Sequence, residues 1–301
     1  VTIDGAATRD FDDALSLERH EEGFEVGVHI ADVAGLVPRD TEVDREALLR
    51  SASLYLPRRQ VPMIPPALSQ DTLSLREGCD RPALSLLCRM NEQGEVLAFR
   101  FAPSLIRVKR RLTYDEVNRG DGGDPLLRDL HRLAGTFQRT RIEKGALVLS
   151  TPEIVLCVDD RGGVSIRRVP QDTPARMLVA EFMILYNWLC ARFCRERRIP
   201  LLYRGQDDPT ERLNPQEMDP LFYVFMQRRK LQPMMIETDP TPHSGLGLDV
   251  YTNATSPIRR YLDLVTQRQM RSTLLGEPVP YDEEALEQIR ITVQASLKDL
   301  A

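Results

Sequence analysis

The chain begins Val1-Thr2-Ile3-Asp4-Gly5-Ala6-Ala7-Thr8-Arg9-Asp10-Phe11-Asp12-Asp13-Ala14-Leu15-Ser16-Leu17. Four aspartates fall within the first thirteen residues, and an apolar segment typical of a β-strand stands on each side of them. Acidic clusters are more often solvated loops than functional sites. Here the flanking strands place the carboxylates next to folded structure rather than in a polar tail, which favours a functional site.

Carboxylates this close together repel one another, so folding forces some of them to bind protons or to find positive charge. A hard divalent cation resolves the conflict, because Mg²⁺ prefers a few carboxylate oxygens and leaves its other positions to water or phosphate. Two such ions about 3.5–4 Å apart can hold both the attacking and the leaving oxygen of a phosphodiester. A calcium loop counted from Asp10 is excluded, because Leu15 stands where that loop needs glycine. The cluster therefore indicates phosphoryl-transfer or phosphodiester chemistry.

Length and composition set the broad class of protein. The 301 residues with 42% hydrophobic content are enough for one large domain or two modest ones, and the start inside a strand-like run indicates a piece of a longer chain. No run of about 18 apolar residues and no signal peptide is visible, so we expect a soluble protein without a membrane partner. The five cysteines form no Cys-x-x-Cys pair, which argues against a disulfide framework, a disulfide-linked partner and a zinc site. We expect a cytoplasmic monomer.

The charge balance limits the kind of nucleic-acid contact. A net charge of −5 argues against a basic surface all round the protein. It leaves open an enzyme whose positive charge lines one groove, and three short basic runs fit that description: Arg107 to Arg111, Arg195 to Arg198, and Arg228 to Lys230. Each run taken alone is more typical of a solvated face.

Hydrophobic periodicity predicts strands in the first half of the chain and helices in the second. The expected strands are Phe24 to Ile30, Leu84 to Met90 paired with Val96 to Phe101, and Ile154 to Val158 paired with Val164 to Val169 across the turn Asp159 to Gly163. The expected helices are Val43 to Ser51, Leu126 to Glu143, Pro174 to about Arg197, and three more that begin at Asn214-Pro215, Ser256-Pro257 and Asp282. This order predicts an α+β fold in one domain over residues 1–301. Mixed and antiparallel sheets in the N-terminal half would pack against long helices from the C-terminal half.

The helix from Pro174 carries a single carboxylate, Glu181, among apolar residues that cover it nearly all round. Such a helix is expected to be buried, and a buried carboxylate is costly without a partner. Glu181 could pair with a buried arginine or accept a hydrogen bond from a substrate hydroxyl. The helix alone does not decide between them.

The third informative stretch is Thr255-Ser256-Pro257-Ile258-Arg259-Arg260-Tyr261. Ser256 or Thr255 can cap a helix that starts with Pro257, and the free N–H groups of a first turn attract anions. Arg259 adds a planar fork suited to two phosphate oxygens. The alternative is an ordinary intrahelical pair of Arg259 with Asp263.

Taken together, these segments resemble the catalytic (RNB) domain of the ribonuclease II and ribonuclease R family of 3′→5′ exoribonucleases. The matching stretches occur in the family's order and span nearly the whole chain. They are Thr2-Ile3-Asp4, Asp10 to Leu15, Val28 to Val33, Tyr55-Leu56-Pro57, Pro62 to Pro65, Leu68-Ser69, Leu73-Ser74-Leu75, Leu112 to Asp115, Glu181-Phe182-Met183 with Asn187, and Thr255 to Tyr261 followed by Asp263.

The resemblance implies a role for each matched site residue. Mg²⁺, with Mn²⁺ as a substitute, would be held by the four aspartates Asp4, Asp10, Asp12 and Asp13. Asp12 matches the aspartate that is most closely tied to the chemical step. Arg259 matches the arginine that grips the reacting phosphate. Tyr114 matches a tyrosine that positions the terminal nucleotide. Glu181 matches a glutamate that, together with this tyrosine, helps to favour ribose over deoxyribose. Tyr55 matches an aromatic residue that stacks at the end of the bound bases.

The chain also departs from the family pattern. No aromatic residue lies in Ile154 to Val158, where the family places a base-clamping phenylalanine, and Gly205 stands where the family has a histidine. The family's cold-shock and S1 RNA-binding domains are absent from these residues. His29 is expected to be a structural residue of the sheet rather than a metal ligand.

The resemblance implies a Mg²⁺-dependent hydrolase that degrades single-stranded RNA from its 3′ end to nucleoside 5′-monophosphates. The alternative is a non-catalytic RNA-binding or scaffold protein on the same fold. The presence of all four aspartates and Arg259 favours the enzyme.

Overall fold

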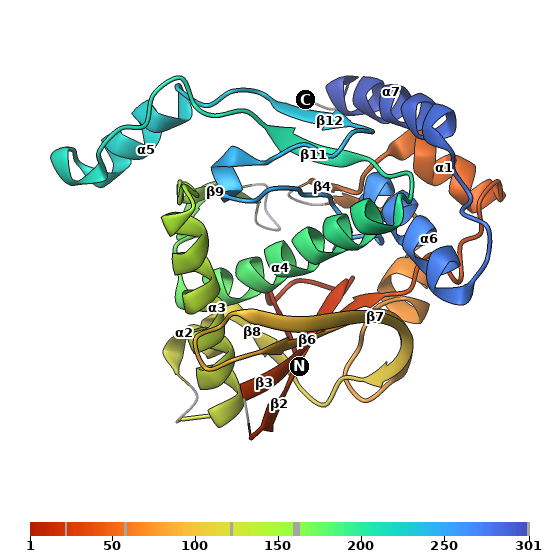
Figure 1. The fold of residues 1–301 in the computed structure, drawn as a ribbon, viewed down its shortest axis with the longest axis horizontal. Coiled ribbons are helices and arrows are strands. Elements are labelled where there is room, and N and C mark those ends of the chain that lie inside the picture. Colours follow the sequence, from red (N-terminus) through yellow and green to blue (C-terminus); the bar gives the residue numbers. More distant parts are fainter. Residues whose placement is uncertain (22, 57–58, 121–122, 159–162, 300–301) are drawn as a thin grey trace.

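The centre of the fold is a four-stranded antiparallel sheet covered by one long helix. In the computed structural model, which describes all residues except 22, 57–58, 121–122, 159–162 and 300–301, the strands follow the order β2-β3-β6-β7. Their bounds are Asp13–His20, Gly23–Ala31, Asp80–Met90 and Val96–Arg107. Helix α4, Pro174–Arg197, crosses the middle of the molecule above this sheet (Figure 1). The predicted α+β fold is confirmed.

The main core lies between this sheet and the helices. Most of strand β3 is buried, and Val26, Val28 and Ile30 have no exposed surface. They belong to one apolar cluster with residues of α4 and of α3, which spans Pro125–Glu143. Because β3 pairs with a strand on each side, its backbone groups are satisfied while its side chains are buried. The predicted strand and the predicted strand pair β6–β7 are confirmed.

Helix α4 begins and ends where its sequence predicts. Pro174 occupies its first turn, and Arg198 ends it in the left-handed conformation with φ 55°. We expected no apolar stretch of membrane-spanning length, but α4 meets that criterion by length and composition, with a mean hydropathy of 1.4 over its most apolar window. Since 67% of this window is buried inside the protein, its apolar surface is used in packing.

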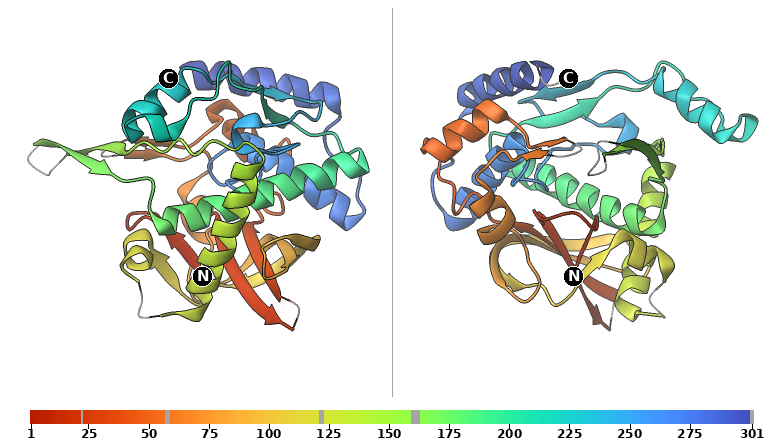
Figure 2. Two further views of the ribbon diagram at one scale, coloured as in Figure 1. Left: turned by 60° about the vertical axis from the view of Figure 1, so that its left-hand side comes forward. Right: turned by 180° about the vertical axis from the view of Figure 1, so that it is seen from behind.

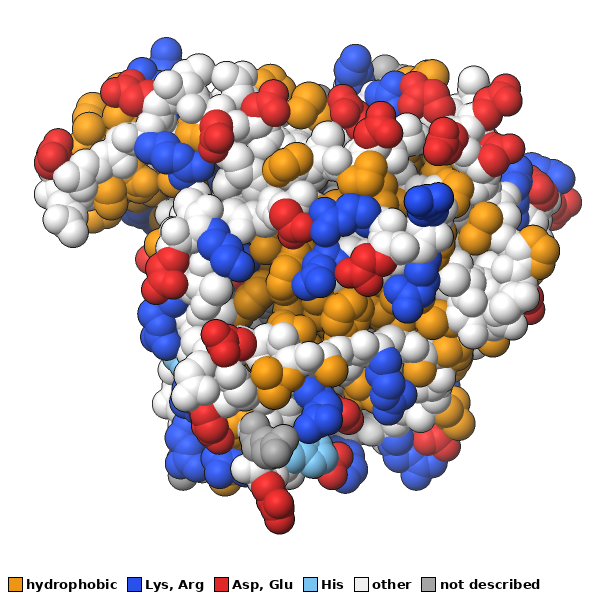
Figure 3. All heavy atoms as spheres, viewed as in Figure 1, with side chains coloured by type: hydrophobic (Ala, Val, Ile, Leu, Met, Phe, Trp, Pro, Cys, Tyr) orange, Lys and Arg blue, Asp and Glu red, His pale blue; other side chains and the backbone are white. Residues whose placement is uncertain are grey.

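Smaller strand pairs and helices complete the structure. The pairs are β1 (Thr2–Asp4) with β8 (Arg111–Thr113), β4 (Leu54–Leu56) with β5 (Arg59–Val61), β9 (Glu153–Val158) with β10 (Val164–Val169), and β11 (Tyr203–Gln206) with β12 (Met234–Glu237). The helices are α1 (Glu42–Arg50), α2 (Tyr114–Arg119), α5 (Pro220–Arg228), α6 (Tyr261–Leu275) and α7 (Glu283–Asp299), with the short helical turns Leu68–Thr72, Pro215–Glu217 and Ser244–Leu246. The β9–β10 hairpin and α5 project from the body (Figure 2). Acidic and basic side chains are interspersed on the face in Figure 3, as the net charge of −5 suggests.

Two predicted helix starts are wrong. The helix predicted from Ser256-Pro257 begins at Tyr261, because one turn that closes on the Ser256 carbonyl is followed by an extended Arg260 with φ −137° and ψ 124°. The helix predicted from Asn214-Pro215 is only the short turn Pro215–Glu217, and α5 starts after the Asp219 cap. Most of the turn predicted across 159–163, and Pro57 of the Tyr-Leu-Pro match, lie outside the described residues.

Candidate active site

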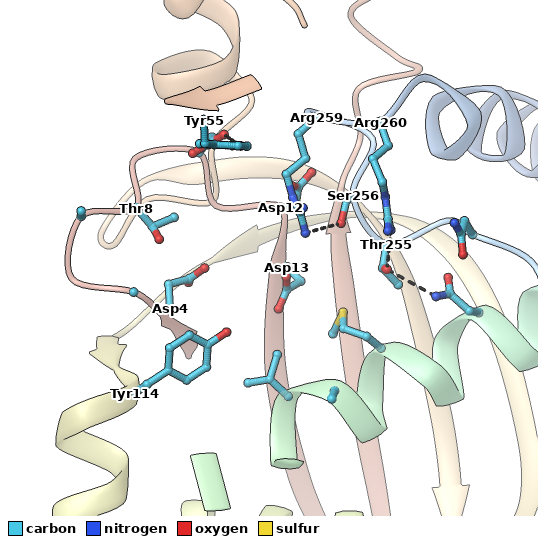
Figure 4. A pocket seen from close by; sticks show the side chains of 18 of the residues that line it. Asp4, Thr8, Asp12, Asp13, Tyr55, Tyr114, Thr255, Ser256, Arg259 and Arg260 are labelled. Carbon is cyan, nitrogen blue, oxygen red and sulfur yellow. Dashed lines mark hydrogen bonds and ion pairs between the residues drawn. The ribbon is translucent and has the colours of Figure 1, made fainter. Parts of the chain in front are cut away.

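A cavity of about 630 Å³ lies where the acidic loop, which we define as Asp4 to Asp13, meets β4, α2, α4 and the segment before α6 (Figure 4). Every predicted site residue except Glu181 lines it. These are Asp4, Asp10, Asp12, Asp13, Tyr55, Tyr114 and Arg259. Residues separated by up to 255 positions in the sequence therefore face one space.

Strand pairing places Asp4 beside Tyr114. Strands β1 and β8 run parallel, and Asp4 is the register partner of Thr113. Thr113 then caps α2 through a capping box with Glu116, so the helix starts at Tyr114. This pairing and this cap position the tyrosine ring toward the acidic loop (Figure 4).

The segment before α6 holds Asp12 from the opposite side. The Ile258 N–H donates to Asp12 Oδ1 at 2.9 Å, and Arg259 Nε donates to Asp12 Oδ2 at 3.2 Å. Asp10 Oδ2 accepts hydrogen bonds from the Tyr55 hydroxyl at 2.6 Å and from Gln60 Nε2 at 3.1 Å. The acidic loop is thus tied to both neighbouring segments through its carboxylates.

The side chain of Arg259 faces the cavity rather than α6. The alternative pair with Asp263 is wrong, because the Asp263 carboxylate instead accepts from Arg260 Nη2 at 2.6 Å and from the Ser256 N–H at 2.9 Å. Arg259 Nη2 also donates to Ser256 Oγ at 2.9 Å. Its side chain remains 44% exposed, so N–H groups of the guanidinium are open to a phosphate.

Burial makes the aspartates hard to ionise. It raises the pKa of Asp4 to about 8, with the Asp13 charge adding to the effect. It also raises the pKa of Asp12 to about 7 and that of Asp13 to about 6, although Arg259 opposes the shift in both. Asp4 Oδ2 is buried and has no hydrogen-bond partner among the residues that the structure describes. At neutral pH these carboxyl groups therefore tend to keep protons, because the protein does not supply enough positive charge for all of them to ionise.

The residues of the acidic loop are of the chemical type that binds a hard divalent cation. They supply carboxylate oxygens that need positive charge in order to ionise, and Asp4 Oδ2, which has no hydrogen-bond partner, is available as a ligand atom. Among the residues that the structure describes, however, no group of three or more His, Cys, Asp or Glu side chains is arranged to hold a metal ion. Two of the four carboxylates, those of Asp10 and Asp12, are held by protein donors instead. The predicted magnesium site stays a prediction.

We predict that Asp4→Asn stabilises the protein in EDTA at pH 8.5. The pKa of Asp4 is raised from 3.8 to about 8, so the folded state binds this proton more tightly than the unfolded state does. The contribution of this proton to the free energy of unfolding is therefore fully present below about pH 4 and is lost as the pH rises to about 8. The melting temperature of the variant should exceed that of the wild type by several degrees at pH 8.5 and by almost nothing at pH 4. Asp207→Asn, at an exposed position, is the control; equal melting temperatures of Asp4→Asn and wild type at pH 8.5 would contradict the assignment.

Glu181 lies outside the cavity, which corrects the expectation that it faces a substrate hydroxyl. Its carboxylate accepts from Arg141 Nη2 at 2.5 Å, from Arg141 Nε at 3.0 Å and from Gln138 Nε2 at 3.0 Å. The side chains of Arg141 and Glu181 are only 5% and 3% exposed. The arginine on α3 thus supplies the positive charge that a buried carboxylate needs, and the pair joins α3 to α4.

Glu181→Ala should therefore act on stability. It leaves Arg141 buried without a counter-charge, a loss of about 3–5 kcal/mol for a broken buried pair. Glu196→Ala, which removes an exposed carboxylate from the same helix, should cost less than about 1 kcal/mol. Denaturant unfolding of both variants measures the difference. An unchanged stability together with an altered ratio of RNA to DNA binding would instead indicate that Glu181 contacts the substrate.

The cavity includes residues to which the sequence assigned no role. Asn187 donates to Thr255 Oγ1 at 3.4 Å and accepts from the Ala254 N–H at 2.8 Å, so it fixes the segment that carries Arg259. The signal in the sequence that could have identified Asn187 is that it is one of the few polar residues in an apolar helix. Gln60, Arg204 and Arg260 also line the cavity, and only their location in the fold identifies them.

The structure also shows the surroundings of the positions at which the chain departs from the family pattern. None of the residues of β9 lines the cavity, and Ile154 and Leu156 are 60% and 49% exposed on the projecting hairpin. At Gly205 an added Cβ would lie 2.5 Å from Thr241 Oγ1, so a larger side chain requires a local shift. His29 has the expected structural role, since its ring nitrogens are hydrogen-bonded to Ser16 Oγ at 2.9 Å and to Ser85 Oγ at 2.7 Å within the sheet.

The sequence and the fold both match known proteins. The family described as RNB domain matches residues 1–218 and 213–276. An uncharacterized ribonuclease of Synechocystis is 37% identical over 307 residues, which cover 99% of this chain and 46% of that protein. The chain spans about half the length of the curated relatives that it matches.

Two solved structures show the range of this fold. The RNase R of Mycoplasma genitalium, in complex with ribose-methylated single-stranded RNA, has a TM-score of 0.86 and 25% identity, with 98% of this chain and 54% of that chain covered. Yeast Ssd1, described as a pseudonuclease, has a TM-score of 0.79 at 19% identity, with 98% and 42% covered. The second likeness concerns the fold alone.

Proposed function

Since this chain belongs to the RNB domain family, we propose that it is the catalytic part of a hydrolytic exoribonuclease. It would degrade single-stranded RNA from the 3′ end, with Mg²⁺ or Mn²⁺, and release nucleoside 5′-monophosphates. In each cycle a water oxygen forms a bond to phosphorus, the bond from phosphorus to the 3′ oxygen breaks, and that oxygen receives a proton. The released nucleotide keeps the phosphate on its 5′ oxygen.

One observation carries this proposal: the cavity combines acidic, basic and aromatic side chains suited to the end of an RNA strand. It is lined by the four aspartates together with Arg259, Tyr55 and Tyr114. A volume of about 630 Å³ lies within the range of about 300–1,000 Å³ for small-molecule sites, enough for a terminal nucleotide.

The chain's own residues supply binding and charge. Arg259, held by Asp12 and Ser256, would take the scissile phosphate and stabilise negative charge that develops on it. Burial raises the pKa of Tyr114 to about 12, so its hydroxyl stays protonated at neutral pH and can donate a hydrogen bond to the terminal nucleotide. Tyr55 is 53% exposed and offers a ring on which a base can stack. A divalent cation bound by the aspartates would lower the pKa of water and neutralise phosphate charge.

A scaffold that binds RNA without cleaving it is the second candidate, because the same fold occurs in a yeast protein described as a pseudonuclease. The retained aspartates and Arg259 favour the enzyme, because a binding protein has no use for uncompensated buried carboxylates next to a phosphate site.

The proposal is tested by product analysis. Single-stranded RNA is incubated with the protein in Mg²⁺, Mn²⁺ or EDTA, and the nucleotides released are separated by chromatography. We expect nucleoside 5′-monophosphates with either metal and none in EDTA. RNA that is bound in a filter assay but stays intact with both metals would support the scaffold instead.

A further inference from the structure

A second cavity of about 460 Å³ adjoins the first, on the other side of the Gly5 to Thr8 loop. The two cavities share five lining residues: Asp4, Gly5, Ala7, Thr8 and Tyr114. The loop between them has small side chains, so little material separates the two spaces. The second cavity therefore borders the candidate active site.

Tyr114 marks the boundary between an acidic and a basic environment. On one side, Asp13 and Asp4 add to the effect of burial and raise the pKa of the phenol. On the other side, the Arg176 guanidinium lies 4.5 Å from the centre of the Tyr114 ring. Tyr114 thus contacts an arginine of the second cavity and lies near carboxylates of the first.

Three arginines line the second cavity: Arg167 and Arg168 at the end of β10, and Arg176 in α4. Within the part of the chain that the structure describes, their side chains make no hydrogen bond or ion pair; Arg176 has only its ring contact. By contrast, Arg110 is paired with Asp124. The carboxylates on the same wall are Asp4, shared with the first cavity, and Asp115 in the first turn of α2. Unpaired guanidinium groups beside a cavity suit a phosphate.

We propose that this second cavity is a product site that receives the nucleoside 5′-monophosphate after cleavage, with Arg167 and Arg168 holding its phosphate. This inference rests on the proposed function. Hydrolysis converts a phosphodiester with one charge into a monoester with nearly two charges at neutral pH. The acidic loop repels this extra charge and the arginines attract it, so the product is drawn past Tyr114 and away from the incoming strand.

The test is nucleotide binding to the intact chain in EDTA, where no RNA needs to be cleaved. Isothermal titration calorimetry with AMP and with adenosine compares three proteins: wild type, Arg167→Ala/Arg168→Ala, and Arg45→Ala/Arg128→Ala. The last pair removes two exposed arginines from α1 and α3, so it matches the charge change and lies outside the cavity. Melting curves check that each variant is folded; Arg167 and Arg168 are themselves exposed.

We expect AMP to bind the wild type and the Arg45/Arg128 control alike, and to bind Arg167→Ala/Arg168→Ala about tenfold or more weakly, as loss of charge-assisted hydrogen bonds predicts. Adenosine should bind all three proteins equally. Equal AMP affinity of the two double variants, or no AMP binding to the wild type, would overturn the product site. Either result can occur in a protein that cleaves RNA, so failure of this inference is distinct from failure of the proposed function.

Discussion

Asp12→Asn is expected to reduce RNA hydrolysis below detection while RNA binding is kept. The substitution removes one negative charge from the acidic loop and replaces the oxygen that accepts from Arg259 Nε with an amide that cannot accept it. The remaining oxygen can still accept from the Ile258 N–H, so the segment before α6 should keep its position. Cleavage of labelled RNA in Mg²⁺ and retention of RNA on a filter measure the two properties.

The control for this variant is Asp207→Asn, an exposed aspartate that lines neither cavity. It should cleave RNA at the wild-type rate. Turnover by Asp12→Asn near that of the control would contradict a role for Asp12 in the chemical step. Loss of binding along with hydrolysis, with a collapsed melting curve, would mean that Asp12 is needed for the fold.

Arg259→Ala should slow the chemical step on the order of 10²–10³-fold, the range for loss of a preorganised electrostatic group. Its guanidinium is held by Asp12 and Ser256 and is 44% exposed toward the cavity. Single-turnover cleavage with enzyme in excess measures this step without product release. The effect should be much smaller on the affinity for RNA, since Arg204 and Arg260 also line the cavity.

Arg259→Lys separates charge from geometry. It keeps the positive charge and loses the planar fork, so its rate should lie between those of wild type and Arg259→Ala. If Arg259→Ala cleaves at the wild-type rate and only its melting temperature falls, Arg259 is a structural partner of Asp12 and the electrostatic account fails.

Local patterns in the sequence predicted much of the fold. The alternation in β3, the Pro174 start of α4 and the apolar surface of that helix each depend on neighbouring residues only, and each is confirmed. The start of α6 was misplaced because Ser256-Pro257 is a good helix start in isolation. In the structure the Asp263 carboxylate binds the Ser256 N–H and Arg260, and Arg260 takes an extended conformation that delays the helix.

The candidate site was predictable in its residue types but not in its pairings. Four carboxylates and an arginine can be recognised from sequence, and all five line one cavity. The partners depend on contacts between distant segments: Asp12 with Arg259 is such a contact, and so is Glu181 with Arg141. No local signal distinguishes a buried arginine on another helix from a substrate hydroxyl, and for that reason Glu181 was misassigned.

We propose that the acidic cavity cleaves RNA stepwise from the 3′ end with a divalent cation. This proposal is tested most directly by parallel time courses on one single-stranded RNA labelled at its 3′ end or at its 5′ end. In Mg²⁺ we expect the 3′ label to appear at once as a mononucleotide, while the 5′ label shortens gradually through a ladder; in EDTA both should stay intact. Early release of the 5′ label, internal fragments at the first time point, or equal cleavage in EDTA would contradict the account.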